Sequence, residues 1–177
     1  MRIYLAVLVL FFMVSVSANA TTLSILGGQA VSNSLSDEKS NAWGVEQEMN
    51  FKHNTWQFGY MNEGHKSNGQ KRDGIYAMYK LASPLTSKLT TSISAGPYFT
   101  ATTVNDQVYA LDTTDEHSLI INPGAYHDSY GLALLASAEA KYQVSALYDV
   151  GARWEHVMLT QHSLDADVFF VEFGRKF

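Results

Sequence analysis

The last eleven residues, 167–177, read DVFFVEFGRKF and decide the fold predicted for this chain. One face of this segment carries four apolar side chains, Phe169, Val171, Phe173 and Phe177. The other face carries Glu172, Gly174 and Lys176. Because successive side chains of a β-strand point to opposite faces, this alternation predicts a strand with one apolar and one polar face.

The same alternation recurs along the rest of the chain. Eight segments show it: 22–31, 41–51, 55–65, 74–82, 88–103, 130–143, 146–158 and 167–177. Most of them are longer than the usual five or six residues of a strand in a soluble sheet, about 17–20 Å. A tilted strand of about 9–11 residues is what crosses a bilayer. The segments are therefore long enough to span a membrane.

The connections between these segments alternate in length. Those at 52–54, 83–87 and 144–145 are short, and those at 32–40, 66–73, 104–129 and 159–166 are longer and polar. Short turns at one end and long loops at the other are typical of outer-membrane barrels, whose termini lie on the periplasmic side. We predict an all-β fold, an eight-stranded antiparallel up-and-down transmembrane β-barrel. A soluble periplasmic barrel or sandwich with its apolar face inward is the alternative.

The first twenty residues read as an export signal. Arg2 supplies the positive end, residues 3–16 form an apolar run, and Ala18-Asn19-Ala20 is a small-x-small cleavage site. We predict a signal peptide over 1–20 and a single barrel domain over 21–177. With the barrel pattern, this places the protein in the bacterial outer membrane.

Composition excludes several classes of protein. The chain has 17 acidic and 12 basic residues, a net charge of −5 and no cysteine. An acidic chain without a basic cluster is a poor nucleic-acid binder. Without cysteine there is no disulfide scaffold, thiolate zinc site or cysteine nucleophile. Aromatic residues make up 12% of the chain, which fits a β-rich protein that buries aromatic surface or shows it to lipid.

An eight-stranded barrel leaves an interior that side chains fill, so no porin-sized channel is expected. The predicted inward faces are mostly acidic, and a buried carboxylate needs a cation or a proton. We expect an interior polar network of Glu139, Lys141, Asp149, Arg153, Glu155 and Glu172. The alternative is an acid–base site among these acids.

A second polar group is expected at the outer rim. Residues 60–65, YMNEGH, and 72–74, RDG, stand on either side of a predicted loop, so a hairpin brings them together. The group comprises Asn62, Glu63, His65, Arg72 and Asp73. We expect an ion-pair clamp that stiffens the loop. A metal site of Glu63, His65 and Asp73, with His127-Asp128 nearby, is an alternative, but no tight ligand spacing supports it, and we predict neither metal nor cofactor.

These motifs carry a family resemblance. With 96–99, GPYF, and the Phe-ended last strand, the rim motifs resemble a family of small exported outer-membrane barrels of Gram-negative bacteria. Members carry Asn-Glu-Gly-His, Arg-Asp-Gly and Gly-Pro-Tyr-Phe segments, and the match covers 42–177. The last strand is similar to those that barrels present to their assembly machinery, except that Arg175 stands where an aromatic is usual. By fold, the family is grouped with the lipid A deacylases.

That grouping implies an enzyme hypothesis. The deacylases use a His-x-Ser pair and a Glu, and here only His127-Asp128-Ser129 has that spacing. In a strand, i and i+2 share a face, so His127 and Ser129 could meet. Glu139 follows on the same strand about 33 Å away, so a rim acid such as Glu63 would have to complete the site. The departure is that the deacylase pair sits near the end of the chain, with its Glu on an adjacent strand.

Two functions from different classes follow. The first is a small outer-membrane barrel with a structural or surface-interaction role in the envelope, acting through loops 104–129 and 159–166. The second is a lipid A acyl hydrolase with His127, Ser129 and Glu63 at the rim. A nonspecific pore is third. The expected partners are outer-membrane lipid, lipopolysaccharide and the barrel assembly machinery, and no nucleic acid.

Overall fold

The computed structural model describes residues 20–32, 39–51, 54–65, 71–105, 108–111, 119–122, 126–159 and 165–177. Within these residues the strands are β1 (Ala20–Ser32), β2 (Lys39–Phe51), β3 (Asn54–His65), β4 (Lys71–Pro84), β5 (Leu89–Asn105), β6 (Val108–Leu111), β7 (Leu119–Asn122), β8 (Tyr126–Gln143), β9 (Tyr148–Leu159) and β10 (Ala166–Lys176). The predicted signal peptide, apart from Ala20, lies outside the described residues.

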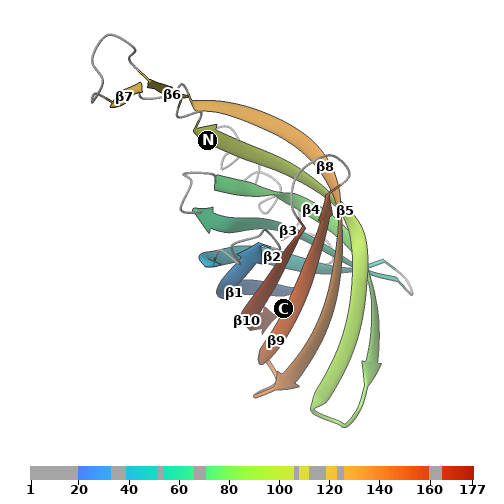
Figure 1. Ribbon diagram of the computed structural model, residues 1–177. Helices are drawn as coiled ribbons and strands as arrows, with labels where there is room; N and C mark the ends of the chain where they lie inside the picture. The colour runs from blue at the N-terminus through green and yellow to red at the C-terminus, as the bar shows by residue number, and fades with distance from the viewer. Residues whose placement is uncertain are drawn as a thin grey trace.

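In the described part of the chain, eight strands close into one antiparallel barrel in the order β1-β10-β9-β8-β5-β4-β3-β2 (Figure 1). The closing pair is β1 with β10, in register from Thr22 opposite Lys176 to Ser32 opposite Ala166. Each of the eight predicted segments overlaps one barrel strand, so the predicted fold class is confirmed. Closure pairs the edge strands with each other and leaves the barrel without an open sheet edge.

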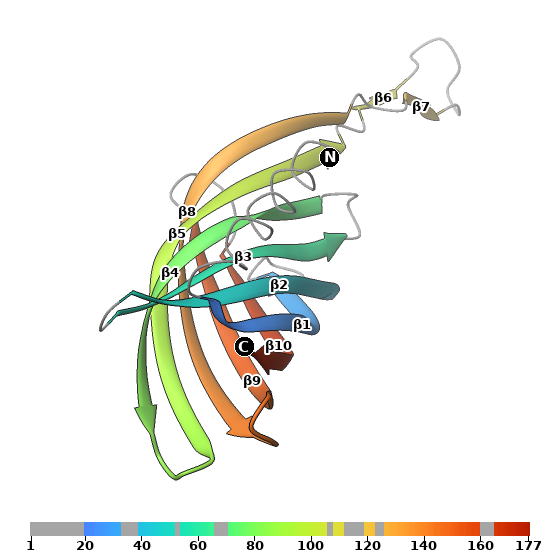
Figure 2. The same cartoon turned by 180° about the vertical axis from the view of Figure 1, so that it is seen from behind.

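The region 104–129, predicted as a loop, contains strand structure. β5 and β8 run on beyond the neighbouring strands and lead to a separate two-stranded sheet of β6 and β7 (Figure 2). β8 begins at Tyr126, four residues before the predicted start. The sequence prediction was wrong here because a four-residue strand is too short to show alternation against its surroundings.

Two short turns join strands at one end of the barrel. Leu85 donates its backbone N–H to the carbonyl of Leu89, at 2.8 Å, and Val144 does the same to Tyr148, at 3.0 Å. In each turn a hydroxyl, Thr86 Oγ1 or Ser145 Oγ, accepts backbone N–H bonds from residues two and three positions later. Such hydroxyl-capped turns are a common way to reverse a chain. We call this end the turn side and the opposite end the loop side.

The outer wall of the barrel is apolar. Phe169, Val171 and Phe173 of β10 are 54%, 65% and 53% exposed, and the residues between them are buried. The other strands add exposed apolar side chains to this belt, among them Ile25, Trp43, Ile75, Ile93, Phe99, Leu132, Leu134 and Trp154. The apolar faces therefore point outward, which is the reverse of a soluble barrel and the arrangement of a bilayer-spanning one.

No helix among the described residues is long and apolar enough to cross a membrane.

The barrel interior changes character along its axis. On the loop side, inward positions are largely apolar, among them Met61, Ala133, Leu135, Val157, Val168 and Phe170. On the turn side, the inward positions of β2, β8, β9 and β10 carry buried charges instead. The two halves together fill the interior with side chains, as expected for eight strands.

Candidate functional site

The buried Arg153 of β9 is the centre of the turn-side interior. Its guanidinium makes a two-pronged contact with Glu46 of β2, with N···O distances of 2.5 and 2.7 Å. It also donates to Glu172 of β10 at 2.9 Å, to Glu155 at 3.2 Å and to Glu139 of β8 at 3.3 Å. Arg suits this position because its planar fork offers five donors in fixed directions. One side chain thereby ties together strands from both sides of the barrel.

Two lysines extend this group toward the turns. Lys80 Nζ lies 2.5 Å from Glu48 and 3.0 Å from Glu139. Lys141 Nζ lies 2.6 Å from Glu48 and 2.7 Å from Glu172. We call the whole group the ionic network; its described members are Glu46, Glu48, Lys80, Glu139, Lys141, Arg153, Glu155 and Glu172. Because its carboxylates outnumber its cations, each cation is shared by at least two acids.

Neutral donors supplement the cations around Glu46. Tyr76 donates its hydroxyl to Glu46 Oε2 at 2.8 Å, and Gln57 donates its amide to Glu46 Oε1 at 3.0 Å. Charge-assisted hydrogen bonds of this kind compensate the loss of water around a buried carboxylate. Glu46 is thus held by side chains from three other strands.

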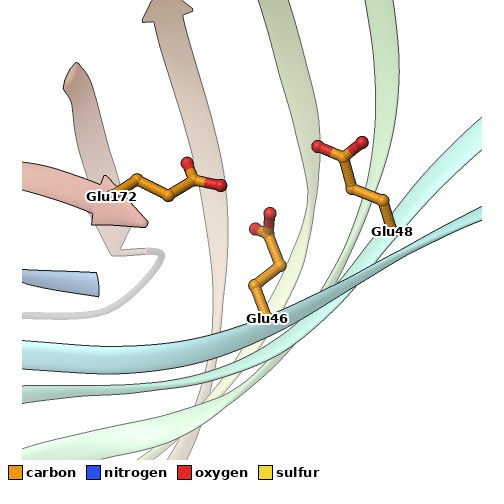
Figure 3. Close-up of side chains that lie close together, drawn as sticks. All are labelled: Glu46, Glu48 and Glu172. Atoms are coloured by element: carbon orange, nitrogen blue, oxygen red, sulfur yellow. The ribbon is translucent and has the colours of Figure 1, made fainter. Parts of the chain in front are cut away.

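Three of these acids gather closely enough to raise the question of a metal. One carboxylate oxygen from each of Glu46, Glu48 and Glu172 lies within 4.8 Å of the others (Figure 3). Each of the three already contacts a lysine or arginine of the ionic network. The donor set therefore fits an ion-pair network, whose cations supply the charge that a metal would otherwise bring.

The predicted interior residues fall into two places. Glu139, Lys141, Arg153, Glu155 and Glu172 are brought together in the ionic network. Asp149 lies at the turn-side end of β9, buried, with Lys176 Nζ at 3.8 Å. It belongs to the end of the barrel near the last residues and not to the group around Arg153.

The predicted rim cluster is divided between the two faces of the wall. Glu63 points inward, where Arg72 donates from Nε at 2.7 Å and from a terminal nitrogen to the same carboxylate oxygen. Tyr98 donates to the other oxygen at 3.3 Å, and Ser40 donates to the Glu63 backbone carbonyl. Together these contacts form a buried clamp that links β2, β3, β4 and β5.

Asp73 lies on the outer face of the same region. Its Oδ2 accepts the hydroxyl of Tyr60 at 2.6 Å and stands 3.9 Å from Lys71 Nζ. Asn62 joins this outer group with its amide 3.4 Å from the Tyr60 hydroxyl. The division follows from the start of β4 at Lys71, because adjacent residues of a strand, here Arg72 and Asp73, must point to opposite faces.

The predicted catalytic residues lie on two strands that are not neighbours in the barrel, β8 and β3. His127 and Ser129 lie on β8, opposite Val104 and Thr102 of β5. Glu63 lies on β3, with β4 and β5 between it and β8. Its carboxylate is buried and bound by Arg72 and Tyr98, inside the barrel. The side chains of His65, His127 and Ser129 lie outside the described part of the structure.

One outward polar group, on the loop side of β9 and β10, was not predicted from the sequence. His156 Nδ1 and Trp154 Nε1 both lie 2.9 Å from Asp167 Oδ1. Since an ionised carboxylate only accepts hydrogen bonds, His156 donates to Asp167 from Nδ1. The shared face of Trp154 and His156 was visible in the sequence. Their register with Asp167 depends on the hairpin between β9 and β10.

Comparisons with known proteins identify the fold. No protein-family model and no curated protein sequence matches the chain. Neisserial surface protein A (NspA) superimposes with a TM-score of 0.63 and 13% identity, over 89% of this chain and 96% of that one. Ail, the attachment invasion locus protein of Yersinia pestis, gives 0.53 and 6%, over 90% and 97%. The N-terminal barrel domain of Pseudomonas aeruginosa OprF gives 0.53 and 12%, over 89% and 99%. The fold is that of small outer-membrane β-barrels.

Proposed function

We propose that residues 21–177 form a small outer-membrane barrel with a structural or surface-interaction role in the Gram-negative envelope. The observation that carries this proposal is the combination of an apolar outer wall with a charged interior. In water this arrangement would expose a continuous apolar belt, whereas in a bilayer the belt meets lipid. The fold shared with NspA, Ail and OprF supports the same location.

The filled interior favours a structural or surface role over transport. The ionic network blocks the turn-side half, and apolar side chains such as Leu135 and Val157 fill the loop-side half. Contact with other molecules would then be made by the outer wall and by the loop-side ends, where β5 and β8 extend.

Aromatic residues at both ends of the outer wall are consistent with a membrane orientation. On the loop side, Tyr60 and Trp154 each donate to a carboxylate, Asp73 or Asp167. On the turn side, the outer wall carries Phe51, Trp56, Tyr79, Tyr142 and Tyr148. Two aromatic girdles at the levels of the lipid headgroups are typical of barrels in this membrane. We infer that the loop side faces the cell exterior.

Expression of the full chain in a Gram-negative host tests the location. We expect the protein in the outer-membrane fraction, with the mass of a mature chain that begins at Thr21. We also expect faster gel mobility before boiling than after it, the behaviour of a folded barrel. A soluble periplasmic protein would contradict the proposal, and a retained N-terminus would contradict only the signal peptide.

The barrel assembly machinery is the proposed partner during insertion. The Phe177 side chain, directly after β10, is 67% exposed, and the Arg175 guanidinium lies 5.2 Å from its ring centre. Deletion of Phe177 should lower the amount of folded protein in the outer membrane. The same deletion should leave refolding of the purified chain in detergent unaffected if Phe177 serves recognition and not stability.

The enzyme alternative is tested on the same cells. A lipid A acyl hydrolase would remove an acyl chain, and the loss would disappear in Ser129→Ala or His127→Ala. The inward position of Glu63, bound to Arg72, weighs against its use as the orienting acid at a lipid-facing site. Unchanged lipid A masses, with the protein folded in the outer membrane, would support the structural or surface role.

A further inference from the structure

A notch of about 160 Å³ opens on the outer wall, where β3, β4, β5 and β8 approach the loop side. Its main lining side chains are Tyr60, Asp73, Ile75, Phe99, Ala101 and Tyr130. The notch follows from the register of the strands. Ala101 of β5 lies between Asp73 of β4 and Tyr130 of β8, and its single methyl group leaves space between two larger side chains.

The notch is graded from apolar to charged along the barrel axis. Its lower wall is Phe99 and Ile75, which are 57% and 41% exposed and continue the apolar belt. Its upper wall carries Asp73, held in place by the Tyr60 hydroxyl at 2.6 Å. Lys71 is the next residue of β4 toward the loop side that faces outward, and its ammonium lies 3.9 Å from Asp73. From the apolar belt toward the loop side, the wall therefore presents first apolar side chains, then the hydrogen-bond acceptor Asp73, and last the cation Lys71.

We propose that this notch binds a hydroxylated, amide-linked acyl chain of lipopolysaccharide in the outer leaflet. The inference rests on the proposed function, because this wall faces lipid in an inserted barrel. Such a lipid has its methylene chain deepest, then a hydroxyl and an amide N–H, then a phosphate. These groups match the Phe99 wall, the Asp73 carboxylate and the Lys71 ammonium in the same order.

The carboxylate distinguishes this lipid from an ordinary phospholipid. An ionised Asp73 only accepts hydrogen bonds, so it needs O–H or N–H donors at its own depth. The ester linkages of a glycerophospholipid offer acceptors there and no donors. Because lipid tails are as apolar as the Phe99 and Ile75 wall, packing of an acyl chain against that wall gives little preference for one lipid over another. The hydrogen bonds to Asp73 should favour lipopolysaccharide by about tenfold.

Native mass spectrometry of the folded protein provides the test. The full mature barrel is extracted from vesicles of deep-rough lipopolysaccharide and phosphatidylethanolamine, and the two retained lipids are counted. Ala101→Trp fills the notch, and Asp73→Leu removes the acceptor without filling it. Ala95→Trp is the matched control, because Ala95 is an exposed alanine on the same face of β5, six residues nearer the turns.

We expect the wild-type and Ala95→Trp proteins to retain lipopolysaccharide about tenfold over phosphatidylethanolamine. We expect Ala101→Trp and Asp73→Leu to lose this preference. Equal retention of the two lipids by the wild type, a preference for phosphatidylethanolamine, or an unchanged ratio in both variants would overturn the proposal. Should Ala101→Trp fail to fold, shown by lost heat-dependent gel mobility, Asp73→Leu carries the test. Failure of the proposed function would instead appear as absence from the outer membrane.

Discussion

The two halves of the barrel interior are filled by different physical means. On the turn side, the ionic network links β2, β4, β8, β9 and β10 through shared charges. On the loop side, apolar side chains such as Leu135 and Val157 pack against one another, and the Glu63–Arg72 pair is embedded among them. The first half depends on direction and charge, and the second depends on volume.

This difference indicates that the two halves contribute differently to the structure of the barrel. A guanidinium bonded to Glu46 and Glu172 fixes how far β9 is shifted against strands across the interior. An apolar layer tolerates small shifts as long as its volume is kept. We therefore expect the turn side to set strand register and the loop side to seal the interior.

The largest effect should come from Arg153→Ala. This change leaves buried carboxylates without their shared cation, and breaking a buried ion pair costs about 3–5 kcal/mol. The contacts with Glu46, Glu139, Glu155 and Glu172 place the expected loss of unfolding free energy at the upper end. Urea titration of the protein in phospholipid vesicles, followed by tryptophan fluorescence, measures it. A loss below about 1 kcal/mol would mean that the network is not what holds this half together.

The next effect is expected at the loop-side ion pair. Glu63→Gln keeps an oxygen acceptor for Arg72 but leaves the buried guanidinium without its counter-charge. We expect a loss of about 3 kcal/mol in unfolding free energy, the lower end for a broken buried pair, because the introduced amide oxygen and Tyr98 remain as neutral neighbours. The same vesicle titration applies. If the loss equals that of Arg153→Ala, ion pairs would hold the loop-side half as strongly as the turn-side half.

Leu135→Ala tests the apolar half directly. Leu135 is fully buried among apolar neighbours, so its truncation leaves a cavity and should cost about 2–3 kcal/mol. Leu135→Met is the matched control, since a change that conserves volume should cost less than about 1.5 kcal/mol. A loss as large from the methionine variant as from the alanine variant would argue against filling by volume.

The eight barrel strands could be predicted because each carries its own evidence. Alternation over nine or more residues, as in 167–177, is visible without knowledge of any partner strand. Which face points outward required the pattern of long and short connections as well. β6 and β7 could not be predicted, since four residues such as 119–122 carry too little pattern.

The candidate sites were less predictable because they depend on strand boundaries and register. The segment 66–73 was predicted as loop, so Arg72 and Asp73 were expected together at the rim. In the structure they stand on opposite faces of β4. His156 lies opposite Asp167 because of the hairpin register between β9 and β10, which no local motif reveals. Alternation gives a face for each residue but not its neighbours across the sheet.

The smallest effect is expected on the outer wall, just beside the clamp. Asp73 is next to Arg72 in the chain, yet its bonds to Tyr60 and its contact with Lys71 are partly exposed. Asp73→Asn keeps an acceptor for the Tyr60 hydroxyl, and partly exposed ion pairs contribute less than about 1 kcal/mol. Vesicle titration of this variant beside Glu63→Gln compares two acids of one hairpin that differ mainly in the face they occupy. An equal loss from both would mean that burial inside the barrel does not govern the strength of these pairs. A small loss of unfolding free energy in Asp73→Asn would mean that the Asp73 carboxylate is not needed to hold the strands and is available for lipid contact. Glu63 would then be the acid that holds the strands together.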